Sequence, residues 1–362
     1  MKVAIIGANG FIGSRLVEHF HLGGTHQVVP VVRKPASLAL PARFAVEWRL
    51  GDALDQTSLA QALQGCEVVV HAAIGDPVQI ERMPEVLCAA CAVAGIKRVV
   101  YLSSASVHGQ AIAPDTTEAT PLHTKHSLEY NNAKVRAETS FFSECRKYQL
   151  EGYALRPGVV YGPRSRWIAD LAAEFATDRA WLYDEGRGIC NSIYVDNLVH
   201  AIERCVSATS GAGEPYLVGD AETVTWADFY TKSAELLGRA MEQVHRVNEL
   251  PAFERTFRDK VENTVAQPWV QSLLPAVPFK LKRATKTLLA SWNPPPPPEA
   301  WSLPGQPAPH ITEEMALLQQ CRWKFPHERA ARTLGYAPPV SFEEAMRRSF
   351  AWYRFATEAD VI

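Results

Sequence analysis

Short apolar runs alternate with helical patterns through the first 165 residues of this 362-residue chain, and this alternation restricts its possible folds most strongly. The apolar runs have the length of buried strands. The segments between them, such as Ser58–Leu63 and Met83–Ala94, are amphipathic and long enough to cross back over a sheet. We therefore predict an α/β fold with a doubly wound parallel sheet, whose strands are expected at Val3–Ile6, Gln27–Val32, Ala45–Leu50, Val68–His71, Arg98–Leu102 and Gly152–Leu155.

Beyond the first 165 residues the pattern becomes mixed, so the chain is expected to divide in two. Residues 1–165 would form the sheet domain, with parts of residues 190–220 completing the sheet. Residues 166–362 would form a smaller, mixed α/β C-terminal domain that binds substrate. Helix starts in this second part carry a hydroxyl residue followed three residues later by an acid, and the elements expected there are Tyr194–Val206, Thr225–Leu237 and a helix that starts at Ser341.

An insertion at about residues 245–320 has a different composition. Its segment Asn293–Pro298 contains five consecutive prolines and is expected to be extended. Pro268–Trp292 mixes large apolar side chains with four basic ones. One hypothesis is an amphipathic segment that touches a membrane surface; the other, which we favour, is a packed lid with a solvated basic face.

Composition excludes several classes of function. The formal charge of −2 gives no general reason to expect a nucleic acid as partner, and no window approaches 18 consecutive apolar residues. The seven cysteines contain no CxxC pair, and the N-terminus starts a strand without a charged leader. We expect a cytoplasmic enzyme with reduced thiols, a small-molecule substrate and no metal site.

A glycine-rich loop follows the first strand directly and leads into a helix that is expected to open at Ser14. Glycines permit a tight turn and a close backbone approach, so amides near Phe11 and Ile12 can meet a pyrophosphate at the positive end of the helix. An ordinary strand-to-helix turn would look similar. At the first strand–helix junction of an α/β pattern, however, the loop favours a Rossmann domain that binds a dinucleotide, through Gly7, Asn9, Gly10, Phe11, Ile12 and Gly13.

The end of the second strand indicates which dinucleotide is preferred. An acid there would bind the adenosine ribose hydroxyls of NAD, whereas this chain has Arg33 and Lys34, which could hold the 2′-phosphate of NADP. Solvated loop cations are the alternative. NADP is favoured over NAD. After the third strand, Asp52 and Ala53 are expected beside the adenine, although Asp52 could instead cap the following turn.

Three hydroxyl residues at the end of the fifth strand precede a Tyr-x-x-x-Lys motif. Open α/β sheets bind ligands at the carboxyl ends of their strands, so Ser103, Ser104 and Ser106 would face cofactor and substrate. Tyr130 and Lys134 would share one helical face. We expect Lys134, together with a positively charged nicotinamide ring, to favour the Tyr130 phenolate, so that Tyr130 exchanges a proton with the substrate while Ser104 orients the reacting oxygen. A tyrosine and a lysine at this spacing also occur by chance on many helices.

These residues belong to an ordered series of segments that covers most of the chain: "GANGFIG", "GDALD", "VVVHAA", "VVYLSSASVHG", "YNNAKVRAE", "LRPGVVYGP", "IYVDNLVHAI" and "ERAARTLGYAPPVSFEEAMRR". The series strongly resembles the extended short-chain dehydrogenase/reductase family, in its NAD-dependent epimerase/dehydratase branch. The resemblance implies that Ser104, Tyr130 and Lys134 are catalytic, with Lys134 also holding the nicotinamide ribose. It further implies contacts with the nicotinamide by Pro157 and Val160 and with the adenosine half by Ala72 and Ala73.

Departures from the family pattern bear on the substrate. His108 stands where the family often has an aromatic residue, and we expect it to be a structural or substrate-pocket residue. The form "RPGVVYGP" leans towards reductases and hydroxysteroid-dehydrogenase-like members rather than UDP-galactose 4-epimerase. Family members build the substrate pocket from the loops matching residues 162–194 here, so the resemblance implies substrate contacts by Arg164, Arg166, Arg187, Asn191 and Tyr194, although each arginine could be a surface side chain. Asp196 is expected to cap a helix.

The main hypothesis is an NAD(P)-dependent oxidoreductase, epimerase or dehydratase that moves hydride between the nicotinamide and a secondary alcohol or ketone, with a sugar or nucleotide-sugar favoured as substrate. The enzyme alternative is a hydroxysteroid- or flavonoid-type reductase, which an apolar pocket built from the insertion at 245–320 would support. A third hypothesis, from another class, is a non-catalytic NADP sensor. The family resemblance also allows a homodimer.

Overall fold

The computed structural model describes residues 1–253 and 307–357. Within the described residues, 1–249 and 309–357 form one compact unit. The predictions for Pro268–Trp292 and for Asn293–Pro298 lie outside the described residues. The compact unit contains the sheet that the sequence predicts.

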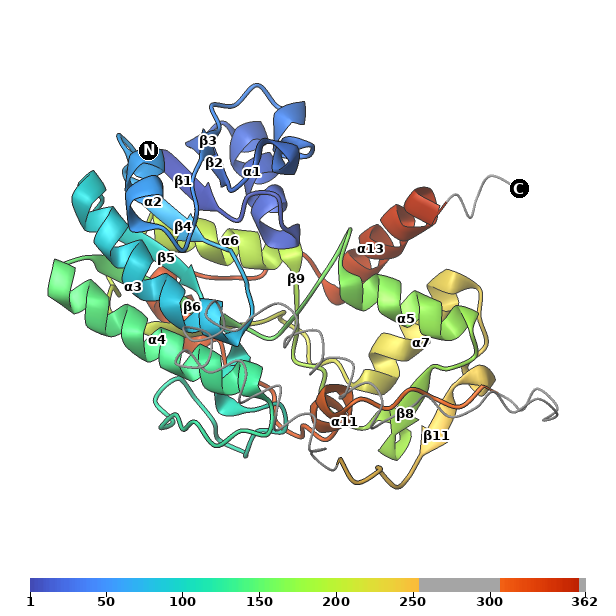
Figure 1. Ribbon diagram of the computed structural model, residues 1–362. Helices are drawn as coiled ribbons and strands as arrows, with labels where there is room; N and C mark the ends of the chain where they lie inside the picture. Colours follow the sequence, from blue (N-terminus) through green and yellow to red (C-terminus); the bar gives the residue numbers. More distant parts are fainter. Residues whose placement is uncertain (254–306, 358–362) are drawn as a thin grey trace, which may run out of the picture. The chain divides into compact units, whose positions relative to one another are not determined.

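A parallel sheet of seven strands is the centre of this unit, in the order β10-β6-β5-β4-β1-β2-β3 (Figure 1). The prediction of a doubly wound parallel sheet is confirmed. Three strands have the predicted bounds: β2 (Gln27–Val32), β4 (Val68–His71) and β5 (Arg98–Leu102). The others are β1 (Lys2–Ile6), β3 (Arg49–Leu50), β6 (Glu151–Pro157) and β10 (Pro215–Val218). The pairs along the sheet are parallel, and β1, β4 and β5 lie centrally.

The prediction for β3 was wrong in length, because the strand covers two residues rather than Ala45–Leu50. Val32 faces β3, since its carbonyl accepts a hydrogen bond from the Gly51 N–H at 3.0 Å. Pro30, two residues earlier, faces the same edge, but proline has no N–H to donate. The ladder therefore cannot extend back beyond Arg49, which pairs with Val31.

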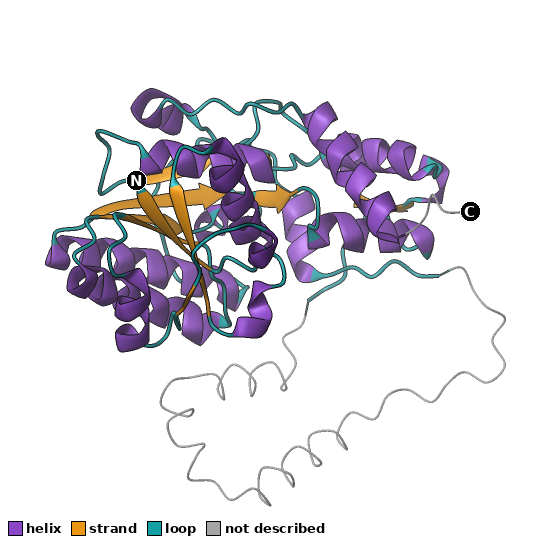
Figure 2. Cartoon of the chain, turned by 90° about the horizontal axis from the view of Figure 1, so that it is seen from above, coloured by secondary structure: helices purple, strands orange, loops and turns teal. Residues whose placement is uncertain are grey.

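Helices cover both faces of the sheet, as Figure 2 shows. One face packs against α1 (Phe11–Gly23), α6 (Val195–Val206) and α12 (Glu328–Leu334). The other packs against α2 (Gln56–Leu63), α3 (Pro77–Ala94) and α4 (Glu129–Tyr148). Because both faces are buried, the central strands β4 and β5 have continuous apolar runs, broken only by His71 and Arg98 at their ends, rather than an alternating pattern.

A smaller lobe of the same unit has its own apolar core. The helix predicted over Thr225–Leu237 is present as α7 (Trp226–Leu237) and begins with a capping box formed by Thr225 and Asp228. The predicted C-terminal helix is α13 (Phe342–Thr357). The lobe also contains α5 (Arg166–Ala176), α11 (Glu313–Gln319), and the short strand pairs β7 (Val159–Tyr161) with β9 (Ser192–Tyr194) and β8 (Trp181–Tyr183) with β11 (His245–Val247).

The glycine loop is shaped by close backbone contacts. Gly7 has φ of +84°, a conformation that favours glycine. A Cβ atom at Gly13 would lie 2.1 Å from the Gly7 carbonyl oxygen, so only glycine fits there. Helix α1 begins at Phe11, three residues earlier than predicted, because Gly10 takes the N-cap position without a side-chain hydrogen bond.

A buried ion pair joins the sheet to α4. Arg156 on β6 and Glu138 on α4 are almost fully buried, with 2.5 Å between Arg156 Nη2 and Glu138 Oε1. The Ser103 hydroxyl donates to Glu138 Oε2 at 2.5 Å. Arg156 Nη1 donates to His108 Nε2 at 3.0 Å, and burial first, then the Arg156 charge, lowers the pKa of His108 to about 3. His108 is thus a neutral acceptor in this network.

All seven cysteines are buried and unpaired. Among residues 1–253 and 307–357, no helix is both long enough and apolar enough to span a bilayer.

Replacing Gly13 by alanine tests the glycine loop. The added methyl group would overlap backbone atoms, so we expect Gly13→Ala to lower the free energy of unfolding by about 2 kcal/mol or more and to abolish dinucleotide binding. Gly23→Ala, in the same helix, is the control, because the nearest atom to its Cβ would lie 3.8 Å away. Urea unfolding measures the stability of both variants. Equal stability of the two variants would contradict the tight packing at Gly13.

The half-buried His108 predicts a pH dependence of stability. Its folded pKa of about 3 lies below the unfolded value near 6.5, so only the unfolded chain takes up this proton between these values. The contribution of His108 is complete above pH 6.5 and is lost as the pH falls towards 3. Relative to His108→Gln, the wild type should lose on the order of 1–2 kcal/mol more between pH 7 and 4.5, measured by urea unfolding. If the free energy of unfolding falls equally with pH in the two proteins, His108 does not titrate in this way.

Candidate active site

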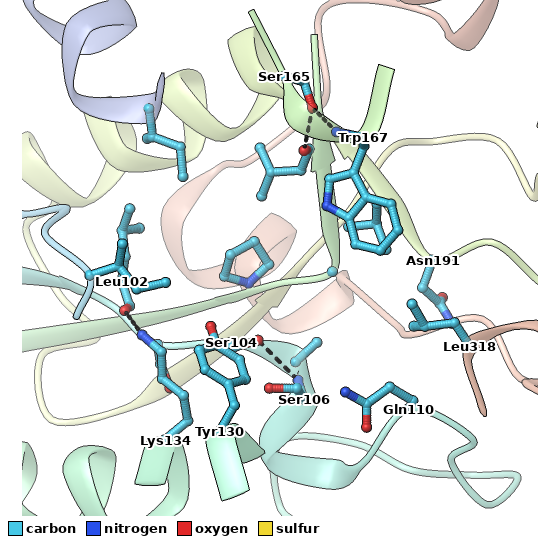
Figure 3. A pocket seen from close by; sticks show the side chains of 18 of the residues that line it. Leu102, Ser104, Ser106, Gln110, Tyr130, Lys134, Ser165, Trp167, Asn191 and Leu318 are labelled. Carbon is cyan, nitrogen blue, oxygen red and sulfur yellow. Dashed lines mark hydrogen bonds between the residues drawn. The ribbon is translucent and has the colours of Figure 1, made fainter. Parts of the chain in front are cut away.

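A cavity of about 470 Å³ lies at the carboxyl ends of β1, β4, β5 and β6, where open α/β sheets bind ligands. Residues from the sheet domain and from the smaller lobe both line it. Figure 3 shows Tyr130, Lys134 and Ser104 on one side and Trp167 on the other. The sequence-predicted residues that the cavity brings together are Gly10, Phe11, Ile12, Ala72, Ala73, Ser103, Ser104, Ser106, Tyr130, Lys134, Pro157, Val160, Arg164, Arg166 and Asn191.

Tyr130 and Lys134 lie one turn apart on α4, and Ser104 follows β5 (Figure 3). Lys134 Nζ is 5.9 Å from the centre of the Tyr130 ring and donates to the Leu102 carbonyl at 3.0 Å. The Ser104 hydroxyl oxygen accepts a hydrogen bond from the Ser106 N–H at 3.2 Å. The predicted convergence of a phenol, an ammonium and a hydroxyl on one cavity is therefore present.

Burial shifts both members of this pair towards their neutral forms. Burial raises the pKa of Tyr130 to about 12, although a hydrogen bond with Ser104 acts in the opposite direction. Burial also lowers the pKa of Lys134 to about 8, while the nearby Glu138 charge opposes that shift. The spacing alone predicts a more acidic phenol. Within the chain itself desolvation dominates, and Tyr130 stays protonated at neutral pH.

The other predicted cofactor contacts lie next to the cavity rather than in its lining. Gly7 and Gly13 form the loop behind it, and Asn9 is exposed in the same loop. Asp52 Oδ1 accepts from the Leu54 N–H at 2.9 Å, so it closes a turn, as one alternative proposed; Ala53 follows in that turn. Arg33 and Lys34 are exposed after β2, and neither forms an ion pair with a described residue.

Three predicted substrate residues do not line the cavity. His108 belongs to the buried Arg156 network, which matches its alternative, structural role. Arg187 is exposed and pairs with Asp184 at 2.8 Å, because the turn Asp184–Gly186 places the two side by side. Tyr194 is buried and packs against Tyr161, since it ends strand β9 inside the core of the lobe.

Asp196 does not cap α6, contrary to the prediction. It lies in the first turn of the helix, where its carboxylate accepts from Arg15 Nε at 2.5 Å. It therefore ties α6 to α1.

Several cavity residues were not predicted from the sequence. They are mostly apolar, with one amide and one acid, and all but two come from the smaller lobe or from the segment after residue 307; the two from the sheet domain are Ile74 and Gln110, and the others are Trp167, Ile189, Glu314, Leu318, Cys321 and Phe325. Glu314 and Leu318 lie near the end of the insertion, Cys321 and Phe325 follow it, and none of the four matches a motif. The high apolar content around them was the only signal in the sequence.

The residues of the loop fit a dinucleotide. A side chain at Gly13 would collide with Gly7, Gly10 leaves the first turn of α1 without a side-chain cap, and Phe11 and Ile12 line the cavity. Amides at a helix N-terminus attract a diphosphate.

Comparison with known proteins agrees with this geometry. The 3beta-hydroxysteroid-dehydrogenase/decarboxylase isoform 2 of Arabidopsis thaliana is 25% identical over 84% of this chain, and the chain spans only 51% of that protein's length. A 2-alkyl-3-oxoalkanoate reductase of Shewanella oneidensis is 25% identical over 95% of this chain and 84% of its own length. The solved structure of a dTDP-glucose 4,6-dehydratase from Streptomyces venezuelae, with NAD bound, has a TM-score of 0.70 at 19% identity and covers 99% of this chain and 98% of its own.

The model of the NAD dependent epimerase/dehydratase family matches residues 3–219, more than half of the chain. The match covers the glycine loop, the strand end with Ser104, and the Tyr130–Lys134 pair. The chain therefore belongs to the NAD dependent epimerase/dehydratase family and is an NAD(P)-dependent enzyme of the extended short-chain dehydrogenase/reductase type.

Proposed function

We propose that this enzyme transfers a hydride between NADP and a secondary alcohol, or the corresponding ketone, on a largely apolar substrate. The observation that carries the proposal is the placement of Tyr130 and Ser104 opposite an apolar wall in one cavity (Figure 3). The wall consists of Trp167, Ile189, Leu318, Cys321 and Phe325.

Three polar side chains that line the cavity are already engaged by the protein. The Asn191 side chain donates to the Trp323 carbonyl at 2.9 Å and accepts from the Phe325 N–H at 2.8 Å. Gln110 exchanges two hydrogen bonds with Asn131. Arg166 has a side chain that is 92% exposed and pairs with Asp170. A nucleotide-sugar diphosphate would find few free partners here, so the cavity favours the apolar alternative among our sequence hypotheses.

Two hydroxyl groups remain available to the reacting oxygen. Tyr130 keeps its proton at neutral pH, which is the state required to protonate a ketone oxygen. Ser104 Oγ accepts from the Ser106 N–H, and its own hydrogen, which faces Tyr130, can turn to a bound substrate oxygen and orient it. The buried Ser106 Oγ has no hydrogen-bond partner among the described residues and could bind another polar group of the substrate.

The bound dinucleotide would supply or accept the hydride. Lys134 uses one N–H on the Leu102 carbonyl, so two donors remain for the nicotinamide ribose. Its charge would also favour proton loss from Tyr130 in the oxidative direction. The same residues can therefore support both reduction of the ketone and oxidation of the alcohol.

The relatives support an apolar substrate. The names of the 3beta-hydroxysteroid-dehydrogenase/decarboxylase and of the 2-alkyl-3-oxoalkanoate reductase both specify an oxygen at carbon 3 of a steroid or alkyl skeleton. The apolar wall would bury such a skeleton, and burial of apolar area contributes about 25 cal/mol per Å². The buried, unpaired cysteines suit a reducing compartment, which supports our expectation of a cytoplasmic location.

A panel of substrates tests the reaction. We expect NADPH oxidation with 3-oxosteroids or 2-alkyl-3-oxoalkanoates and none with UDP-glucose, UDP-glucuronic acid or dTDP-glucose. Tyr130→Phe should reduce kcat by about 10²- to 10⁴-fold while the NADPH dissociation constant stays unchanged. Turnover of a nucleotide sugar alone would reject the apolar substrate. Unaltered kcat in Tyr130→Phe would reject the assigned acid, and turnover of none of the compounds would favour the non-catalytic sensor.

Arg33 and Lys34 are the basis for the choice of NADP. Both are exposed and without ion pairs among the described residues, so they are free to bind a 2′-phosphate. We expect Arg33→Ala to weaken NADPH binding roughly 10- to 100-fold and to leave NADH binding unchanged, as measured by fluorescence titration. Equal affinity of the wild type for NADH and NADPH would contradict this role.

A further inference from the structure

Arg164 occupies a strained position between the two lobes. It follows β7 and precedes α5, with φ of +73°, a left-handed conformation that is uncommon for a side-chain-bearing residue. Its Nη1 donates to Ser14 Oγ at 2.9 Å, and the Ser14 hydroxyl in turn donates to the Phe11 carbonyl at 3.2 Å. The guanidinium group of the smaller lobe thus lies against the first turn of α1.

The charge of Arg164 is not balanced by an ion pair. No carboxylate among the described residues lies within ion-pair distance of its guanidinium group. Burial, and then the positive charge of Arg43, lowers its pKa, and Glu18 opposes this only weakly. A half-buried, unpaired guanidinium with free N–H donors is a site that an anion would stabilise.

Arg164 lines the same cavity as Gly10, Phe11 and Ile12, the residues at the start of α1. The diphosphate of a dinucleotide is the anion that this fold brings to that helix end. The family resemblance implies a substrate contact for Arg164. Its hydrogen bond to Ser14 instead directs it towards the cofactor side of the cavity.

We propose that Arg164 is a cofactor-binding residue, which contacts the diphosphate of the bound dinucleotide from the smaller lobe. The glycine loop holds the diphosphate with backbone amides, and Arg164 adds the charge that those amides lack. Cofactor binding thereby links the smaller lobe to α1. This role does not depend on which alcohol or ketone the enzyme uses.

Arg164→Gly separates binding from folding. Glycine adopts positive φ without steric cost, so the variant should unfold at the same temperature as the wild type or higher. Its affinity for NADPH should fall roughly 10- to 100-fold, by isothermal titration calorimetry. Arg166→Ala is the matched control, because Arg166 also lines the cavity but is 92% exposed and paired with Asp170.

Three further titrations locate the contact. ADP-ribose, which carries the diphosphate without the nicotinamide, should lose affinity for Arg164→Gly as NADPH does. Adenosine, which carries no phosphate, should bind wild type and variant equally. Unchanged ADP-ribose affinity in Arg164→Gly would overturn the proposal, and so would a loss confined to UDP-glucose, which would assign Arg164 to a substrate diphosphate.

Discussion

The buried ion pair between Arg156 and Glu138 fixes the position of the catalytic helix on the sheet. Taking both charges out of water costs several kcal/mol per ion, and only a well-formed geometry offsets that cost. Here Arg156 makes hydrogen bonds to both carboxylate oxygens, and Ser103 donates to the same carboxylate. The pair therefore defines one register between β6, the end of β5 and α4. Ser104 and Tyr130 come from two of these elements, so their approach depends on it.

The same burial determines the chemistry of the site. It holds Tyr130 as a phenol and makes Lys134 easier to deprotonate, and these shifts oppose the simple expectation that an ammonium makes a neighbouring phenol acidic. The Lys134 ammonium points at the Leu102 carbonyl, which lies on β5. Proton loss from Tyr130 would need a further positive charge in the cavity. The direction of proton transfer is thus coupled to what is bound there.

Local signals in the sequence were sufficient for most of the fold. Valine-rich runs defined β2, β4 and β5, and the glycine loop identified the first crossover. They failed at β3, where a proline in the neighbouring strand ends the ladder, a constraint that only the pairing register reveals. For Asp196, proximity to a helix start suggested a cap, whereas Arg15, 181 residues away, takes its carboxylate.

In the cavity, too, the residues that local sequence signals predict differ from those that only the long-range packing of the chain brings together. Its catalytic half could be predicted because Tyr130 and Lys134 are neighbours in sequence, and because the strand end with Ser104 has a fixed place in a doubly wound sheet. Its apolar half could not, since Trp167, Ile189 and Leu318 come from separate elements. The energetic effect of burial on each side chain could not be predicted from the sequence either. The shifted pKa of Tyr130 depends on how much of the phenol the surrounding chain covers.

The hydrogen bonds of Asn191 bear on how the substrate range of such an enzyme can change. Its amide holds the backbone of Trp323 and Phe325, so one side chain next to β9 anchors the strip of chain that adds Phe325 to the apolar wall. None of that wall belongs to α4 or β5. Substitutions in the segment that Asn191 anchors could change the apolar wall and leave the proton-transfer residues intact. In this architecture, substrate range and catalytic activity can therefore change independently of each other.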